Sequence, residues 1–134
     1  MINGINHITI SVKDIDKAFM FYKNILELKP VMKSNQSAYF YAGDTWIALD
    51  KREPYIKSKN YSHICFNIPK RFYKKFIGRI KENGVKEWQK NKTEGDSLYL
   101  LDDSENKLEI HFSSFSERIK FGKKHFGKEV EWFV

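Results

Sequence analysis

Hydrophobic and polar residues alternate in two similar segments of the chain, HITISV at residues 7–12 and HICFNI at residues 63–68. A period of two residues is typical of a strand that buries one of its faces. Each segment begins with a histidine, although the whole chain has only 4 histidines. The pattern therefore predicts two related strands that each carry an imidazole at the start.

A helical pattern follows each predicted strand. Asp14 is a suitable N-cap for the first helix, and the sequence ENG at residues 82–84 is a suitable stop for the second. The apolar stripe of the first helix consists of Ile15, Phe19, Tyr22 and Leu26, and Leu28 closes the run. The apolar stripe of the second helix consists of Phe72, Phe76 and Ile80. Both stripes have the spacing of a helix face that packs on a core.

Three short strand-like segments come after each helix, so the repeating unit is βαβββ. They lie at residues 29–33, 37–41 and 45–50 in the first half, and at 85–89, 97–101 and 107–112 in the second. The polar sequence DKREPYIKSKNY at residues 50–61 is expected to be a surface linker. The sequence thus predicts an α+β fold with paired βαβββ modules at about 1–52 and 61–112. Residues 1–134 form a single domain in this interpretation, with a C-terminal tail.

Composition narrows the class of protein. The 134 residues are 41% hydrophobic, which suffices for one core. The single cysteine, Cys65, excludes an internal disulfide, and we find neither a membrane-length apolar run nor a signal-peptide pattern, so we expect a cytoplasmic protein. The net charge of +7 favours anionic partners. Because no nucleic-acid recognition motif is present, we expect a small anionic substrate, with no nucleic acid and no membrane as partner.

His7, His63 and Glu109 are the candidate metal ligands. Strand alternation places each of them on the face opposite the apolar residues, and a duplicated scaffold would make His7 and His63 face one another. Imidazole and carboxylate are suitable ligands for Zn, Mn, Fe or Co, and three protein ligands leave positions free for a substrate. A single strand histidine is more often a hydrogen-bonded structural residue, but the repeated register favours a metal.

Three further residues bear on this hypothesis. His111 shares the face of Glu109 and is the competing ligand, whereas His125 in the tail is expected at the surface. Ala48 occupies the position of the first module that corresponds to Glu109, so a second carboxylate is missing there. This favours a substrate that itself supplies ligands.

Several segments of the chain resemble one known family. They are INHITISV at residues 5–12, AYF at 38–40, TWIAL at 45–49, YSHICFNI at 61–68, EWQKNKTEGDS at 87–97, YLLDDSENKLEIH at 99–111 and ERI at 117–119. On these segments the chain resembles the vicinal oxygen chelate proteins, and specifically the fosfomycin resistance thiol transferases of the glutathione-using type. The string NKTEGDSLY ahead of KLEIH is the most specific part of the resemblance.

The resemblance implies that His7, His63 and Glu109 bind Mn²⁺ or another divalent ion such as Zn²⁺. It implies a domain-exchanged homodimer, in which His7 of one subunit joins the other two ligands from its partner. It also implies that residues 91–97 wrap a K⁺ ion, although without the resemblance an ordinary polar turn would be expected. The potassium loop would use Asn91, Thr93, Gly95 and Ser97, with Glu94 nearby.

The implied reaction is opening of the epoxide of fosfomycin by a small thiol such as glutathione. Thr9 is expected beside the epoxide oxygen, Tyr39 is the second catalytic candidate, and Gln36 matches a position near the thiol. The residues expected to bind fosfomycin are Trp46, Tyr61, Gln89, Lys92, Thr93, Ser97, Tyr99 and Arg118. An arginine and several hydroxyl groups suit a dianionic phosphonate.

The chain departs from the family at one expected contact. Where the family has a lysine that contacts the phosphonate, this chain has Gln89 followed by Lys90, which strand alternation turns away. Either a small register shift brings Lys90 to the site, or Lys92 supplies the charge. Cys65 shares a strand face with His63, but without an evident base it is expected to be a packed thiol.

Other functions stay open as alternatives. An epoxide hydrolase would need a further carboxylate to activate water, and Asp44, in a turn, is the near candidate. A ring-cleaving dioxygenase would use the same ligands with Fe(II). A metal-free module that sequesters an anionic drug would not require His7 and His63.

Overall fold

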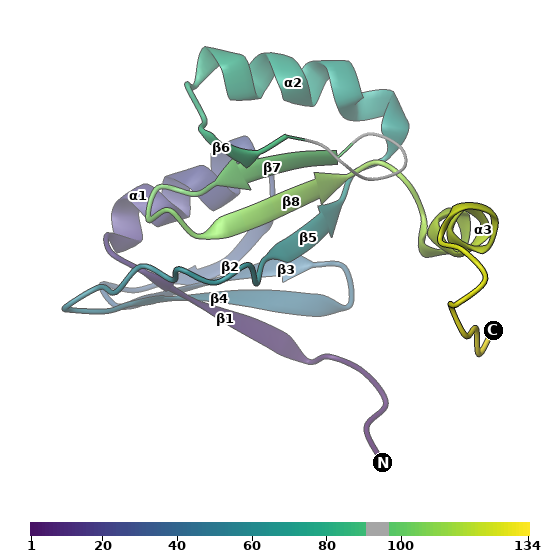
Figure 1. Cartoon of the computed structure of the whole chain (residues 1–134). Coiled ribbons are helices and arrows are strands. Elements are labelled where there is room, and N and C mark those ends of the chain that lie inside the picture. Colours follow the sequence, from purple (N-terminus) through teal and green to yellow (C-terminus); the bar gives the residue numbers. More distant parts are fainter. Residues whose placement is uncertain (91–96) are drawn as a thin grey trace.

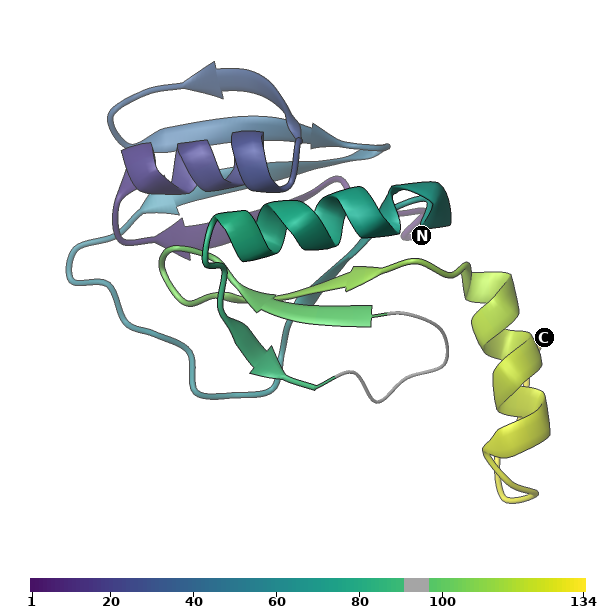
Figure 2. The ribbon, with the colours of Figure 1, turned by 90° about the horizontal axis from the view of Figure 1, so that it is seen from above.

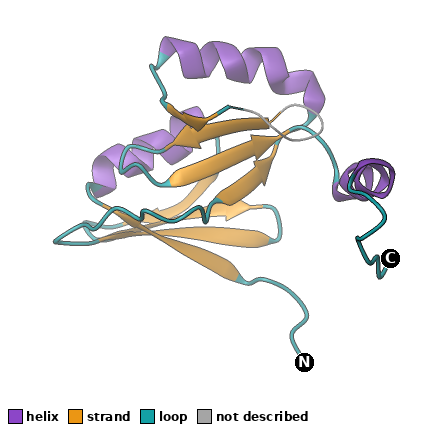
Figure 3. Cartoon of the chain, viewed as in Figure 1, coloured by secondary structure: helices purple, strands orange, loops and turns teal. Residues whose placement is uncertain are grey.

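Two four-stranded sheets form the body of the protein, one from each half of the chain (Figure 1). The computed structural model describes residues 1–90 and 97–134. The first half contains β1 (His7–Val12), α1 (Ile15–Met20), the π-helical turn η1 (Phe21–Ile25), β2 (Lys29–Lys33), β3 (Ser37–Ala42) and β4 (Thr45–Lys51). The second half contains β5 (Ile64–Asn67), the 3-10 turn η2 (Lys70–Phe72), α2 (Tyr73–Glu82), β6 (Glu87–Gln89), β7 (Ser97–Leu101), β8 (Lys107–His111) and α3 (Phe115–His125). The expected α+β fold of paired βαβββ modules is confirmed (Figure 3).

The first strand of each module pairs in parallel with the last strand of that module. The strand order is β1-β4-β3-β2 in the first sheet and β5-β8-β7-β6 in the second. In the first sheet Ala48 lies opposite Tyr39, and in the second Glu109 lies opposite Tyr99. Ala48 and Glu109 are therefore equivalent positions of the two modules, as the repeat in the sequence predicts.

Helices α1 and α2 each cover the apolar face of their own sheet (Figure 2). The larger core consists of Ile10, Val12, Ile15, Ala18, Tyr22, Ala38, Phe40, Ile47, Leu49 and Leu108. The smaller core consists of Phe76, Ile80, Leu100, Ile110 and Phe112. Because Leu108 of the second module belongs to the larger core, the two modules pack on one another. The opposite, more polar faces of both sheets carry the histidines.

A buried hydrogen bond also joins the two modules. The hydroxyl of Tyr22, at the start of η1, donates to Oδ2 of Asp102 in the β7–β8 turn at 2.8 Å. Asp102 Oδ1 accepts from the main-chain N–H groups of Ser104 and Asn106, both at 2.9 Å. Burial raises the pKa of Asp102, and burial together with the Asp102 charge raises the pKa of Tyr22. This link ties the first helix to the turn that precedes β8.

The structure differs from the sequence-based expectations in three places. The first helix changes to a π-helical turn after Met20. Phe72, expected in the apolar stripe of the second helix, is 42% exposed, because the chain forms the 3-10 turn there. The C-terminal tail contains helix α3, which begins with a capping box formed by Ser114 and Glu117. In the described residues, no helix is long and apolar enough to cross a membrane.

We predict that Tyr22→Phe lowers the free energy of unfolding by about 1–2 kcal/mol, because it leaves a buried carboxylate without one of its donors. Urea unfolding at neutral pH measures this change. Tyr55→Phe is the matched control, since its hydroxyl donates to Asn106 from a less buried place and its loss should cost less than about 1 kcal/mol. Equal effects of the two substitutions would contradict the inter-module role of Tyr22.

Candidate metal and substrate site

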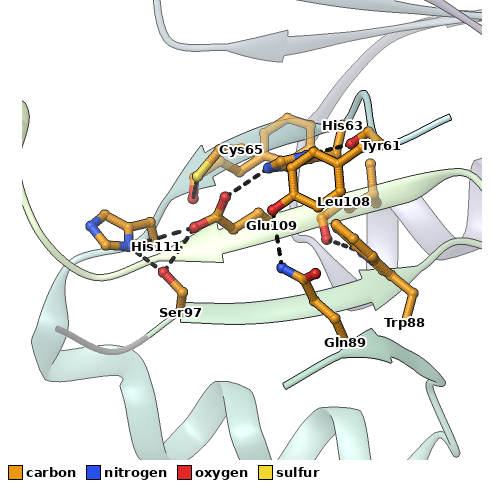
Figure 4. Close-up of polar contacts among 10 residues, drawn as sticks. Tyr61, His63, Cys65, Trp88, Gln89, Ser97, Leu108, Glu109 and His111 are labelled. Carbon is orange, nitrogen blue, oxygen red and sulfur yellow. Dashed lines mark hydrogen bonds and ion pairs between the residues drawn. The ribbon is translucent and has the colours of Figure 1, made fainter. Parts of the chain in front are cut away.

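His63 and Glu109 face each other on the polar side of the second sheet (Figure 4). His63 comes directly before β5, and Glu109 is the middle residue of β8, which pairs with β5. The Nε2 atom of His63 lies 3.0 Å from Oε2 of Glu109. Only 19% of the His63 side chain and 12% of the Glu109 side chain are exposed. Parallel pairing of the two strands thus brings together two groups that are distant in the sequence.

A hydrogen bond on the other side of the imidazole orients His63. Its Nδ1 atom lies 2.9 Å from the carbonyl oxygen of Tyr61, which can only accept, so Nδ1 carries the hydrogen. In a neutral imidazole, Nε2 then has a lone pair that faces a carboxylate oxygen of Glu109, which also has only lone pairs. This contact needs a positive charge between the two atoms, either a proton or a metal ion. A distance of 3.0 Å is that of an ordinary hydrogen bond, and the same two atoms are also suitable ligands for a divalent ion, which His63 and Glu109 would hold.

Aromatic side chains surround His63. The ring centres of Tyr61 and Trp88 lie 5.2 and 5.3 Å from the centre of the imidazole. The ring centre of Tyr99 lies 6.2 Å away. The indole of Trp88 is held in place because its Nε1 donates to the carbonyl oxygen of Leu108 at 2.9 Å. These rings exclude water from part of the site, which strengthens the electrostatic interactions within it.

Trp88 is a site residue that the sequence reasoning missed. Strand β6 has a register shift between Glu87 and Gln89. Gln89 donates from Nε2 to the hydroxyl of Tyr61 at 3.3 Å, so the neighbours Trp88 and Gln89 both reach the site. Simple alternation allows only one of them to do so. Lys90, the next residue, is exposed.

His111 lies beyond Glu109, on the side away from His63 (Figure 4). Its Nδ1 atom makes a short contact with the hydroxyl of Ser97 and lies 3.8 Å from Oε1 of Glu109. The same Ser97 hydroxyl donates to Oε1 at 2.9 Å. His63 thus approaches one carboxylate oxygen, while Ser97 and His111 approach the other. Its other ring nitrogen, Nε2, points away from Glu109 (Figure 4), so this arrangement does not place His111 beside Glu109 as a second ligand to the same ion.

His7 belongs to a second group of residues, on the polar face of the first sheet. Its imidazole stacks on Trp46, with ring centres 4.3 Å apart, and Trp46 lies 4.7 Å from Tyr39. Nδ1 of His7 lies 2.7 Å from Oδ1 of Asn6, which fixes the ring. Thr9 follows on the same face and is exposed. The expected catalytic residues Thr9 and Tyr39 are therefore placed with His7 and Trp46.

A single chain does not bring the three expected ligands together. Among residues 1–90 and 97–134, no group of three or more histidine, cysteine or acidic side chains is arranged to hold a metal ion. Of the residues grouped with His7, Thr9 alone lines a cavity of about 340 Å³ with His63, between β1 and the linker. The expectation that His7 and His63 face one another is thus not met within one chain. Alternation fixes the face of each sheet but not how the two sheets are arranged.

The other expected residues lie apart from these two groups or outside the described residues. Gln36 lies in the exposed turn before β3, where its carbonyl oxygen accepts from the N–H of Lys51. Asp44 is exposed in the β3–β4 turn, and His125 is exposed at the end of α3, as expected. The residues Asn91, Lys92, Thr93, Glu94 and Gly95 lie outside the described residues.

Cys65 lies beside Glu109 in β5. Burial and the charge of Glu109 raise the pKa of its thiol to about 12, while the positive charge of Arg118 acts in the opposite direction. Cys65 is thus a protonated thiol at neutral pH, which disfavours a nucleophile. Its side chain is nevertheless exposed in the single chain, so the expectation of a packed thiol is wrong.

The comparisons with known proteins agree with the fold of paired βαβββ modules. The Glyoxalase/Bleomycin resistance protein/Dioxygenase superfamily matches residues 4–110. A variant of the fosfomycin resistance protein FosX from Listeria monocytogenes, in complex with Mn(II) and 1S,2S-dihydroxypropylphosphonic acid, superposes with a TM-score of 0.78. It is 27% identical, over 89% of this chain and 99% of that chain. The chain belongs to the fosfomycin resistance family of this superfamily. The family resemblance expected from the sequence is thus confirmed.

Curated relatives in this family share about a third of their residues with the chain. The Glutathione transferase FosA of Serratia marcescens is 32% identical over 123 residues, which cover 89% of this chain and 87% of the relative. The Metallothiol transferase FosB of Shouchella clausii is 38% identical over 127 residues, which cover 89% and 86%. The family therefore contains both glutathione and metallothiol transferases.

We predict that Cys65 of the metal-free protein reacts with iodoacetamide at pH 8 at least about 100-fold more slowly than in the urea-unfolded chain. The raised pKa lowers the thiolate fraction about a thousandfold, and only the thiolate reacts. Because the chain has one cysteine, mass spectrometry measures the rate directly. The native rate should rise with pH up to about 12, and a rate equal to that of the unfolded chain would contradict the raised pKa of the thiol.

Proposed function

We propose that the chain is a metal-dependent transferase that opens the epoxide of fosfomycin by adding a small thiol, such as glutathione. The observation that carries the proposal is the contact of 3.0 Å between His63 Nε2 and Glu109 Oε2, two lone-pair atoms that need a cation between them. The aromatic residues beside this pair provide a wall for a small substrate. The pair stays partly exposed in a single chain, at 19% and 12% of its side chains, which leaves an approach for a further ligand and a substrate.

His63 and Glu109 would hold a divalent ion together with His7 of a second copy. Mn²⁺ is the proposed ion, since Mn(II) is named in the complex of the FosX relative and the donor set of imidazole and carboxylate suits it. When bound, the ion supplies Lewis-acid stabilisation of the negative charge on the epoxide oxygen. A K⁺ ion held by residues 91–97 is part of the proposal on the strength of the sequence resemblance alone.

A domain-exchanged homodimer is the arrangement that completes this donor set. In one chain, His7 lies with Trp46 on the first sheet, apart from His63. A second copy would place its first-sheet face, with its own copies of Thr9 and Tyr39, against the second-sheet face that carries His63 and Glu109.

The residues of the chain bind and orient the two substrates in this proposal. The positive charge of Arg118 and the hydroxyl of Tyr99, which lies opposite Glu109 in the sheet, would provide donors for the phosphonate. Tyr61 and Trp88 cover the apolar part of the molecule, and Gln89 donates to the Tyr61 hydroxyl and holds that ring. Thr9 of the second copy would donate to the epoxide oxygen, and Tyr39 and Gln36 would lie toward the thiol.

Hydrolysis of the same epoxide is the second candidate. The dihydroxypropylphosphonic acid in the FosX complex is the type of compound that water addition to an epoxypropylphosphonate gives. Such a reaction needs a base for the water molecule. Within the described residues, the carboxylate that contacts His63 is Glu109, which the metal would use, and Asp44 is exposed in a turn. This favours the thiol over water as the nucleophile.

Mass spectrometry of reaction mixtures tests the proposal. Each mixture contains the purified protein, fosfomycin, Mn²⁺ and K⁺, and either no thiol or one of glutathione, cysteine and bacillithiol. We expect an adduct with the mass of fosfomycin plus one thiol. A diol in every reaction, including the one without thiol, would identify a hydrolase instead. No change of fosfomycin under any condition would contradict both.

We predict that His63→Ala lowers turnover at least about 1000-fold and leaves a folded protein, because it removes a ligand without disturbing either core. His125→Ala is the matched control and should keep full turnover, since its imidazole stacks on Phe121 at the surface. Circular dichroism checks the fold of both variants. Full activity of His63→Ala would refute the site.

Mixing two inactive variants tests whether the site is shared between chains. Chains with His7→Ala and chains with His63→Ala should each be inactive alone. After joint refolding, half of the dimers contain one chain of each kind, and exchange leaves one of their two sites intact, so we predict about a quarter of wild-type activity. A mixture as inactive as the separate variants would contradict the exchanged arrangement.

A further inference from the structure

His111 is the buried polar residue that the proposed reaction leaves without a role. It is 9% exposed, and its Nε2 atom has no hydrogen-bond partner in the described part of the chain. Its Nδ1 atom contacts the hydroxyl of Ser97. A buried imidazole with one nitrogen unsatisfied is costly, so its other contact is expected to serve a purpose.

The direction of the hydrogen bonds from His111 to Glu109 follows from the chemistry of the groups (Figure 4). The hydroxyl of Ser97 has one hydrogen, and it donates this hydrogen to Oε1 of Glu109 at 2.9 Å. The contact between Ser97 and His111 then requires Nδ1–H of His111 as the donor. His111 therefore donates to Ser97, and Ser97 donates to the carboxylate.

This chain of hydrogen bonds distinguishes the two oxygens of Glu109. Oε1 is held by Ser97, whereas Oε2 faces Nε2 of His63 at 3.0 Å. A carboxylate with one oxygen held in this way cannot rotate without breaking a buried hydrogen bond. It also presents a single oxygen toward His63. Partners of this kind, which orient a ligand without touching the ion, typically change metal affinity 10–100-fold, an order-of-magnitude guide.

The first module lacks this chain of hydrogen bonds, so the chain accompanies the carboxylate of Glu109 and is not a general feature of the repeated module. Ser37 and Asp50 are the residues that pair in the first sheet as Ser97 and His111 do in the second. There the Ser37 hydroxyl donates to Asp50 itself at 3.4 Å, and Asp50 forms an ion pair with Arg52. Because Ala48 replaces the glutamate in this module, no ligand needs support. An imidazole donor occurs at this place only in the module that has Glu109.

We propose that His111 is a positioning residue that, through Ser97, holds Oε1 of Glu109 and keeps Oε2 turned toward His63 as the metal ligand. This inference rests on the proposed function, because it assumes that Glu109 binds the metal. His111 itself is not a ligand in this arrangement. The residue acts on metal affinity through another side chain.

Titration of each metal-free protein with Mn²⁺, followed by EPR of the free ion, measures the affinity directly. Four variants are compared with wild type, namely His111→Asn, His111→Phe, Ser97→Ala and the double variant His111→Phe with Ser97→Ala. The amide nitrogen of asparagine takes the place of Nδ1, so we expect His111→Asn to stay within about 3-fold of wild type. His111→Phe keeps a similar size without the donor and should weaken binding about 10–100-fold.

The remaining variants separate positioning from a general loss of stability. Ser97→Ala should weaken binding as much as His111→Phe, and the double variant should be no more than about 2-fold weaker than either, because both act through one hydrogen-bond chain. Thermal unfolding of the metal-free proteins serves as the structural control. A loss of affinity that follows the unfolding temperature, with asparagine no better than phenylalanine, would overturn the positioning role.

Two outcomes distinguish this inference from the proposed function. Tight Mn²⁺ binding by wild type that is unchanged in His111→Phe overturns the role of His111 and leaves the metal site intact. Absence of Mn²⁺ binding by the wild-type protein overturns both. If the loss of binding free energy in the double variant equals the sum of the losses in the two single variants, His111 and Ser97 act separately. This result also contradicts the proposal.

Discussion

The parallel pairing of the first and last strands in each module is the constraint on which the rest of the structure depends. In the second module, this pairing places Glu109 of β8 beside the start of β5, so its carboxylate meets the imidazole of His63. The apolar residues on the opposite face bury against α2 and hold the strands in register. A shift of the β8 register by one residue would turn the Glu109 side chain into the core and separate it from His63. The site is therefore a consequence of the same alternation that builds the core.

The arrangement of donor atoms explains why the proposed centre is divided. His63 and Glu109 form a pair of lone-pair donors that needs a cation, and Ser97 and His111 complete the surroundings of the carboxylate. The first sheet offers a different surface, with His7 stacked on Trp46 and without a carboxylate at the position equivalent to Glu109. In the proposed assembly, each face supplies half of the binding site. Assembly of two copies would then couple metal binding to dimer formation, because neither face has a complete donor set.

Much of the fold could be predicted from the sequence, because the period of two and the repeated histidine register determine strands, faces and the equivalence of Ala48 with Glu109. The arrangement of the two sheets could not, since alternation says nothing about which chain supplies His7. Trp88 was missed because the register shift in β6 breaks the alternation on which the reasoning relied. Helix α3 was missed although the spacing of Ser114 and Glu117 is a capping-box signal. The capping-box residues could have predicted this helix from the sequence, whereas they say nothing about the register shift in β6.

The central claim is that two imidazoles and one carboxylate oxygen bind one metal ion at the face of the second sheet. Pulsed EPR of Mn²⁺ bound to the wild-type protein tests it most directly, because each coordinated imidazole nitrogen modulates the electron-spin echo. The account predicts modulation from two histidine nitrogens, reduced to one in His7→Ala and lost with the bound ion in Glu109→Gln. A bound ion that shows no nitrogen coupling, or whose coupling is unchanged when residue 63 is alanine, would contradict it.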